Sequence, residues 1–367
     1  MRVAINLSFL LPGVVGGSEE YSVRLLRAVL EHHPDIDLEV VAHDALFEGH
    51  PALAANGSRV AGPVGFRPYR VVAESVLVPR FTRAADLTHH FGGRLPARAT
   101  SPSVVTIHDI QPLDLPQNFS STKAAFLRRS LPKTARRADL ICTPTRWVAE
   151  RVVERLGVPD DRVRVIGPAV GRRPVASERD AIASIVGDRP VVLFPAITHP
   201  HKNHRLLIDA MARVHRDRPD ALLVLTGGAG LAAADVAADI DRVDPDGAFI
   251  RHLGRIEENL LMGLLADADV VAYPSTYEGF GLPVLEAMQA GTPVLAADAA
   301  CLPEVVGDAG LLLPADDAER WAIEIITLLD DADRRARLAA AGSVRATEWA
   351  GEEASDRLVD AWRDVVS

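Results

Sequence analysis

Short apolar runs rich in β-branched residues alternate along the chain with stretches of helix-forming residues. Such runs are typical of buried parallel strands, and the stretches between them suit the helices that connect parallel strands. The first series of predicted strands is Val3–Phe9, Leu38–His43, Leu87–Phe91, Val104–His108 and Leu140–Thr143. A second series follows Pro168, at Val191–Ala196, Leu222–Thr226, Phe249–Leu253, Val270–Tyr273, Val294–Ala297 and Leu311–Leu313. The pattern therefore predicts an α/β protein with two Rossmann-like domains.

The link between the two series is predicted at Gly167–Pro174, which contains Gly, Pro and Arg residues and has no apolar period. Such segments are typical of domain boundaries. We expect one domain over residues 1–169 and another over residues 170–351. The final stretch, Glu352–Val366, predicts a helix with one apolar face, formed by Leu358, Val359, Trp362 and Val366.

The most informative stretch, Tyr273–Val294, predicts a strand, a glycine loop and a short helix. Pro283 suits a first helical turn, and Gly291 suits the position just past the last one. Gly279 and Gly281 allow the backbone to approach a ligand closely, and the N–H groups at the helix start favour an anion such as phosphate.

Two glutamates flank this predicted phosphate site. Glu278 lies at the strand end and Glu286 one turn into the helix, so each carboxylate is placed to accept hydrogen bonds from hydroxyl groups. A ligand with hydroxyl groups on both sides of a phosphate is a nucleotide sugar. The alternative is that Glu278 is a solvated loop residue and Glu286 an exposed helix residue.

The string E-G-F-G-L-P-V-L-E-A-M at residues 278–288 resembles the Glu-x7-Glu signature of family 4 glycosyltransferases, retaining enzymes of the GT-B fold that use nucleotide-sugar donors. The resemblance implies that Glu278 contacts the donor sugar and Glu286 the ribose. It also implies that the final helix packs on the first, acceptor-side domain, and that residues 170–351 bind the donor. The loop residues implied to lie near the sugar and diphosphate are Gly279, Phe280, Gly281 and Leu282.

Two loops of the first domain extend the resemblance. Gly16 and Gly17 precede a predicted helix that Ser18 is expected to cap, and they resemble the family's loop beside the donor diphosphate. The alternative is an ordinary strand-to-helix turn. His108 resembles the family's donor-contacting histidine, although a structural histidine bonded to the backbone also fits. Asp109 is expected either to orient the imidazole or to approach the acceptor hydroxyl.

Pro200–Asn203 resembles the Pro-Arg-Lys-Asn segment of the same family, with His201 where arginine is usual. Lys202 would then contact the donor diphosphate. It is one of only three lysines among 40 basic residues, which supports a specific role for a compact ammonium group. Family members often have a further cation where Ala196 stands, and His201 or Arg255 is expected to compensate for it.

Two further loops at strand ends are predicted to frame the nucleobase. Their residues are Gly227, Gly228, Arg255 and Ile256. The glycines would give access and the apolar side chain would stack on the ring, but guanine, uracil and adenine are not distinguished.

No catalytic metal and no cofactor apart from the donor co-substrate are expected. His199, His201 and His204 suggest a zinc site by spacing, but no carboxylate or cysteine stands near them in the sequence. Asp267 and Asp269 resemble the Asp-x-Asp metal site of another glycosyltransferase fold. They lie at the amino end of a predicted strand, however, and ligands of parallel sheets bind beyond the carboxyl ends of the strands.

Composition favours a reduced, cytoplasmic setting, because Cys142 and Cys301 show no disulfide or zinc spacing and no signal peptide or membrane span is evident. The net charge is −10, with basic residues in excess only over residues 1–170. The basic stretch from Lys123 to Arg137 suits a weak peripheral membrane contact or an anionic acceptor, although a solvated helix face interrupted by Pro132 fits better. Nucleic-acid binding is not expected, because aromatic residues do not interleave with the basic ones.

Together these features predict an enzyme that transfers a hexose from a nucleotide sugar to a hydroxyl of a saccharide or glycoconjugate acceptor. The resemblance implies retention of anomeric configuration, and the overall similarity to bacterial mannosyltransferases favours GDP-mannose. The alternatives are a UDP-glucose or UDP-N-acetylglucosamine donor, a nucleotide-sugar epimerase of similar form, and a non-catalytic nucleotide-sugar-binding protein.

Overall fold

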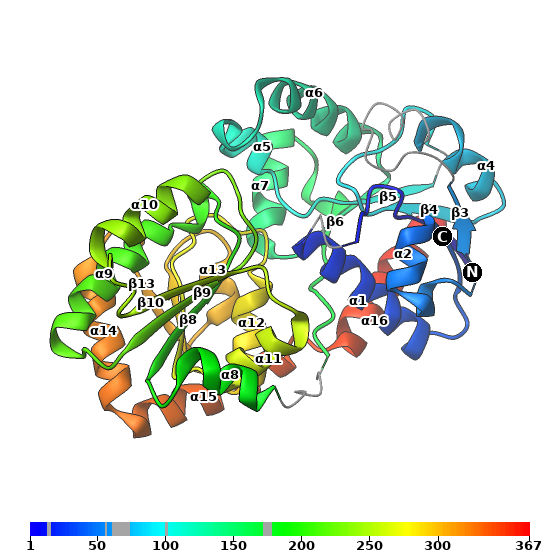
Figure 1. Cartoon of the computed structure of the whole chain (residues 1–367). Coiled ribbons are helices and arrows are strands. Elements are labelled where there is room, and N and C mark those ends of the chain that lie inside the picture. Colours follow the sequence, from blue (N-terminus) through cyan, green and yellow to red (C-terminus); the bar gives the residue numbers. More distant parts are fainter. Residues whose placement is uncertain (13–15, 56, 61–73, 100–101, 172–177) are drawn as a thin grey trace. The chain divides into compact units, whose positions relative to one another are not determined.

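The computed structural model of the chain describes residues 1–12, 16–55, 57–60, 74–99, 102–171 and 178–367. It divides into two compact units, unit 1 made of Met1–Gly171 and Trp349–Ser367, and unit 2 made of Arg172–Glu348. Residues 172–174 of the predicted hinge lie outside the described part. Each unit contains one parallel sheet with helices around it (Figure 1), which confirms the prediction of two Rossmann-like domains.

Unit 1 is built on a seven-stranded sheet with the order β3-β2-β1-β4-β5-β6-β7. Its strands are β1 (Arg2–Asn6), β2 (Asp37–Ala42), β3 (Gly57–Arg59), β4 (Leu87–His90), β5 (Ser103–Thr106), β6 (Leu140–Thr143) and β7 (Val163–Val165). Its helices are α1 (Gly17–His32), α2 (Asp44–Gly49), α4 (Val78–Thr82), α5 (Gln111–Asp114), α6 (Ser121–Arg137), α7 (Arg146–Leu156) and α16 (Gly351–Val366).

Unit 2 is built on a six-stranded sheet with the order β10-β9-β8-β11-β12-β13. Its strands are β8 (Val191–Pro195), β9 (Leu222–Thr226), β10 (Ile250–Gly254), β11 (Val270–Tyr273), β12 (Val294–Ala297) and β13 (Leu311–Leu313). Its helices are α8 (Arg179–Val186), α9 (His204–Asp217), α10 (Ala233–Val243), α11 (Glu258–Asp267), α12 (Leu282–Ala290), α13 (Leu302–Val306), α14 (Ala318–Asp330) and α15 (Ala332–Thr347).

The strand order of each sheet reverses direction at one point. In unit 1 this switch point lies between β1 and β4, and in unit 2 it lies between β8 and β11. The loops that leave two such strands diverge to opposite faces, which opens a crevice at their carboxyl ends where ligands of this architecture bind. The loops that follow these four strands are therefore the places where a site is expected.

The last helix, α16, packs beside α1 in unit 1 although it follows unit 2 in the sequence (Figure 1). Leu358, Val359 and Trp362 are completely buried, in one apolar cluster with Leu25 and Leu26 of α1. The expected apolar face of this helix is confirmed at these positions. Val366 was predicted to lie on the same face, but it is 41% exposed because the helix ends there.

Two strands were missed by the sequence analysis. β3 and β7 lie at the two edges of the first sheet, have only three residues each, and form no apolar run of their own, since Arg59 and Arg164 interrupt the pattern. The predicted strand Val3–Phe9 was too long, because the chain leaves the sheet after Asn6 and turns, with Leu10 N donating to Leu7 O at 2.9 Å.

Two local predictions about helices were wrong. Ser18 does not cap α1, because Gly16, with a φ of 69°, turns the chain earlier and places Ser18 inside the first turn. Pro132 does not break the basic stretch, because α6 continues through it. An internal proline costs about 3 kcal/mol, and the burial of Leu131 and Ala135 in the core offsets that cost.

Among the described residues, no helix combines the length and apolarity needed to cross a membrane.

Candidate active site

The loops after β8 and β11 are tied together at the switch point of unit 2. The carbonyl oxygen of His201 accepts hydrogen bonds from Thr276 N at 2.8 Å and from Ser275 Oγ at 3.2 Å. The side chain of Asn203 donates to Pro274 O at 3.3 Å, from a backbone in the left-handed region with a φ of 59°. The two loops are thus tied together by hydrogen bonds to backbone carbonyl oxygens, which fix the positions of the side chains between them.

Lys202, Tyr273 and Glu278 form a closed triangle of hydrogen bonds. Lys202 Nζ lies 2.5 Å from Glu278 Oε1 and 3.0 Å from Tyr273 Oη, and Tyr273 Oη lies 3.1 Å from the same carboxylate oxygen. An ammonium only donates and a carboxylate only accepts, so the tyrosine accepts from Lys202 and donates to Glu278. Two of the three ammonium protons are used, and the third remains for a further oxygen.

The triangle is charged although it is largely buried. Burial by itself lowers the pKa of Lys202, but attraction to Glu278 outweighs it, and the pKa lies above its ordinary value. Burial likewise raises the pKa of Glu278, but Lys202 outweighs this effect and holds it below its ordinary value. The pKa of Tyr273 is raised by burial and by Glu278, so its hydroxyl keeps its proton. At neutral pH the three groups are an ammonium, a carboxylate and a phenol.

Tyr273 is the one member of this triangle that the sequence analysis did not select. It ends an apolar strand and is itself only 1% exposed, so it had the appearance of a core residue. Its position at the carboxyl end of β11, immediately before Pro274, is the signal that would have identified it.

The loop and helix after Glu278 follow the prediction closely. α12 covers Leu282–Ala290 as expected, Pro283 lies in its first turn, and Gly291, with a φ of 78°, ends it. Gly281 has a φ of 86°, and an added Cβ would lie 2.9 Å from Leu302 Cδ2, so this position requires glycine. Glu286 is half-buried in the second turn of α12.

Gly227 and Gly228 follow β9, and Arg255 and Ile256 follow β10. Gly227 N donates to Gly254 O at 2.8 Å, so these two loops are adjacent. A Cβ at Gly227 would lie 2.3 Å from the carbonyl oxygen of Ala196. The close approach of the loop after β8 is therefore enough to require glycine at position 227, whether or not a nucleobase binds there.

The three histidines near Lys202 are held in different ways. The rings of His199 and His201 stack, with centroids 5.6 Å apart, whereas His204 packs against Phe194 at 4.7 Å. Burial and the neighbouring Lys202 lower the pKa of His201 to about 4, so this ring is neutral at pH 7 and does not replace the cation missing at Ala196. No group of three or more potential ligands is arranged for a metal ion within the described ranges.

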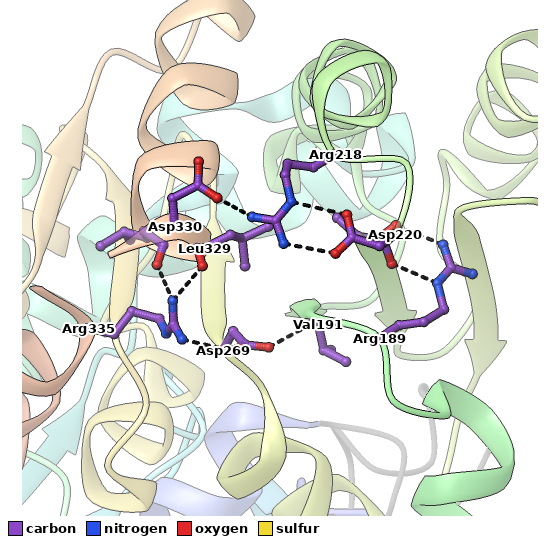
Figure 2. A network of polar contacts seen from close by, with 10 residues as sticks. Arg189, Val191, Arg218, Asp220, Asp269, Leu329, Asp330 and Arg335 are labelled. Carbon is purple, nitrogen blue, oxygen red and sulfur yellow. Dashed lines mark hydrogen bonds and ion pairs between the residues drawn. The ribbon is translucent and has the colours of Figure 1, made fainter. Parts of the chain in front are cut away.

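Asp269 has a structural role at the opposite end of the sheet (Figure 2). One carboxylate oxygen accepts from Val191 N at 2.9 Å, and the other lies 3.5 Å from Arg335 Nη2. Arg335 in turn donates to Leu329 O at 2.8 Å. Asp269 thus joins the amino ends of β8 and β11 to Arg335 in the first turn of α15, which is bonded in turn to the last turn of α14.

The candidate residues of unit 1 lie beyond β5. His108 Nε2 is 2.8 Å from the carbonyl oxygen of Phe91, and a carbonyl only accepts, so the proton is on Nε2 and Nδ1 remains as an acceptor. Burial lowers the pKa of His108 to about 4, and the Phe91 bond opposes this only in part, so the ring is neutral at pH 7. Asp109 Oδ1 accepts from Gln111 N at 2.9 Å. The imidazole N–H of His108 thus donates to Phe91 O and not to Asp109.

His108 and Asp109 line a cavity of about 730 Å³ in unit 1, together with Ser18 and Asn6. Gly16 and Gly17 stand just before Ser18, at the start of α1, and residues 13–15 of their loop lie outside the described part. The structure therefore brings Lys202, His201 and Glu278 together in unit 2, and it brings His108 and Asp109 together in unit 1.

Two protein-family models match most of the chain. Residues 15–173 match the model described as Glycosyltransferase Family 4, and residues 177–345 match the model described as Glycosyl transferases group 1. The chain belongs to the family 4 glycosyltransferases. The resemblance seen in residues 278–288 is thereby confirmed, and so is the GT-B fold.

Curated relatives of this glycosyltransferase include sugar transferases with different acceptors in their names. It is 27% identical over 321 residues to O-antigen chain mannosyltransferase B of Escherichia coli, with 84% of each chain covered. It is 30% identical to a GDP-mannose-dependent monoacylated phosphatidylinositol monomannoside mannosyltransferase of Corynebacterium glutamicum, with 64% of each chain covered. It is 30% identical to D-inositol 3-phosphate glycosyltransferase of Rhodococcus opacus, spanning 62% of this chain but only 53% of the relative.

Solved structures share the fold of the glycosyltransferase over nearly its whole length. Anabaena HepE in complex with UDP-glucose superposes with a TM-score of 0.78 at 21% identity, covering 99% of this chain and 100% of that one. Sucrose-phosphate synthase from Thermosynechococcus elongatus gives a TM-score of 0.79 at 20% identity, covering 99% and 98%.

Proposed function

We propose that the protein transfers a mannosyl group from GDP-mannose to a hydroxyl group of a saccharide or glycoconjugate acceptor, with retention of the anomeric configuration. The observation on which this rests is the triangle of Lys202, Tyr273 and Glu278 at the switch point of unit 2. It presents a fixed positive charge and a fixed carboxylate a few ångströms apart, which suits a ligand with both phosphate and hydroxyl groups.

The phosphate end of the donor would be held by two features of unit 2. The third proton of Lys202 would donate to a diphosphate oxygen, and the N–H groups at the start of α12 would favour the same negative charge. Glu278 would accept a hydrogen bond from a hydroxyl of the sugar, and Glu286 would accept one from a hydroxyl of the ribose.

Mannose is proposed because two of the relatives are named mannosyltransferases, one of them GDP-mannose-dependent. His108 of unit 1 has a neutral ring, and its Nδ1 atom remains an acceptor for a hydroxyl group. No metal ion is included in the proposal, because the diphosphate charge is assigned to Lys202 and the backbone N–H groups.

In the proposed reaction the acceptor oxygen forms a bond to the anomeric carbon on the face from which the diphosphate departs. The bond between that carbon and the diphosphate oxygen breaks, and the acceptor proton passes to the departing diphosphate. Negative charge develops on the leaving oxygen, where fixed donors stabilise the transition state more than they do in water. Lys202 is the principal donor of this kind in the proposal.

The test is a thermal-shift series of the full chain against GDP-, UDP-, ADP- and dTDP-sugars without added metal. A ligand at 100 times its Kd stabilises the native state by about 2.7 kcal/mol, which corresponds to a rise in Tm of roughly 5–10 °C for a domain of this size. We expect this rise with GDP-mannose. A rise in Tm with a UDP-sugar alone would show that the donor is a UDP-sugar and not GDP-mannose. An unchanged Tm with every nucleotide sugar would contradict the proposal.

Glu278 and Glu286 should be separable by ligand. Glu278→Ala should weaken GDP-mannose binding about tenfold more than GDP binding, because the lost contact with the sugar hydroxyl affects only GDP-mannose, whereas the lost partner of Lys202 affects both ligands. Glu286→Ala should weaken both ligands to a similar degree, because both contain ribose. Isothermal titration of each variant measures this, with Glu319→Ala, an exposed glutamate of α14, as control. Equal losses for GDP and GDP-mannose in both variants would refute the division.

A further inference from the structure

The cavity of unit 1 has walls from distant parts of the sequence. It lies at the carboxyl ends of β1, β4 and β5, where Asn6, Gly93 and His108 line it, and α6 forms another wall. Its volume of about 730 Å³ falls within the range of small-molecule sites. Asp109 places a carboxylate in the same wall as His108.

Two phenylalanines give this cavity apolar, flat surfaces. Phe119 and Phe126 both line it, and Phe126 is 45% exposed, which is high for an aromatic side chain of this size. Pyranose rings have apolar C–H faces that pack on aromatic rings, and their hydroxyls need acceptors and donors at the ring edge. The cavity supplies both, since Asp109 and the Nδ1 atom of His108 are polar groups in the same lining.

The cations of the cavity are already engaged. Arg94 Nη2 forms an ion pair with Glu74 Oε2 at 2.6 Å, and its guanidinium lies 5.2 Å from the centre of the Phe126 ring. Lys123 Nζ lies 4.7 Å from the centre of the Phe119 ring. Each cation therefore makes a cation–π interaction with an aromatic ring of the lining, which is favourable without any ligand.

The charges of the described lining residues balance. Glu74 and Asp109 are acidic, Arg94 and Lys123 are basic, and His108 is neutral at pH 7. A diphosphate or phospholipid head group would need an excess of positive charge to compensate for its desolvation. The described lining does not provide that excess, whereas an uncharged sugar requires none.

We propose that this cavity binds the acceptor and that the acceptor part bound there is an uncharged saccharide of at least two rings. The reacting hydroxyl lies toward His108 and Asp109, and the following ring packs on Phe119 and Phe126. This inference rests on the proposed function and adds the chemical class of the acceptor to it.

The test measures transfer from GDP-mannose to disaccharides of mannose, glucose and galactose, and to the same disaccharides phosphorylated at the reducing end. We expect uncharged disaccharides to be acceptors with a KM that changes less than about twofold between 50 and 500 mM salt. Phosphorylated acceptors with a KM at least tenfold lower, weakened by salt, would overturn the proposal in favour of an anionic head group. An absence of transfer to every uncharged disaccharide would also overturn it.

Variants within α6 separate an uncharged saccharide from an anionic head group. Phe126→Ala should raise the acceptor KM at least tenfold and leave the donor-induced thermal shift unchanged, since unit 2 is untouched. Lys123→Gln should change the KM for an uncharged acceptor less than about fivefold. Leu30→Ala, at a position 39% exposed on α1, is the control for truncation of an exposed side chain. An acceptor KM that Phe126→Ala leaves unchanged would refute the site.

The donor-induced shift is recorded on the same samples. A shift with GDP-mannose but no effect of Phe126→Ala would refute the acceptor site alone. The absence of both the shift and transfer would refute the proposed function as well.

Discussion

Lys202→Met should reduce sugar transfer about 100- to 1,000-fold, the usual effect of removing one preorganised donor from a developing oxyanion. Methionine keeps the apolar part of the side chain, so the ammonium is the main loss. The measurement is kcat at saturating donor and acceptor. A variant that retains more than a tenth of the wild-type kcat would show that Lys202 does not stabilise the leaving diphosphate.

The same substitution should also lower the free energy of unfolding of unit 2, by about 3 kcal/mol, because it leaves the buried Glu278 without its partner. Both side chains of the pair are less than 15% exposed, so solvent screens them little. The double variant Lys202→Met/Glu278→Gln removes both charges and should recover most of this stability without recovering transfer. Tyr273→Phe, which removes one hydroxyl and no charge, should give an intermediate loss of kcat.

Trp362→Ala should destabilise unit 1 by about 3–5 kcal/mol, the usual range for deletion of a buried aromatic side chain. Trp362 is completely buried, and its indole N–H donates to His89 Nδ1 at 3.0 Å. Because indole only donates, His89 has its proton on Nε2, which donates to Thr106 Oγ1 at 2.8 Å. Loss of the indole therefore leaves a cavity and a buried acceptor without its donor.

Denaturant unfolding followed by circular dichroism measures this effect, with the transitions of the two units fitted separately. Trp362→Phe keeps most of the volume and should cost about half as much. Val366→Ala, at an exposed position of the same helix, should change the free energy by less than about 0.5 kcal/mol. A loss below 1 kcal/mol for Trp362→Ala would contradict the packing of α16.

The parts of the structure that local signals specify were predicted well. α12 begins and ends where Gly281, Pro283 and Gly291 indicated, since each of these residues acts on its own stretch of backbone. The central strands were predicted because burial on both faces requires continuous apolar runs. The edge strands β3 and β7 are subject to no such requirement, so their sequences contained no signal.

The parts that depend on contacts between distant segments were predicted less well. Tyr273 contacts Lys202 only because β8 and β11 are neighbours in the sheet, and the sequence of neither strand specifies that order. α6 continues through Pro132 only because tertiary packing outweighs a local preference. The cavity of unit 1 combines segments up to 125 residues apart, and the sequence analysis selected His108 and Asp109 but neither of the two phenylalanines.

The position of α16 has a consequence for how the protein is made. Unit 2 is one continuous stretch of chain, so the ribosome delivers all of it before Gly351–Val366 has been synthesised. Until then the apolar side chains of α1 that pack against Leu358 and Trp362 stay exposed to solvent. Domains generally fold as units during synthesis. Unit 2 therefore completes its core first, and unit 1, although it begins the chain, is the last to close.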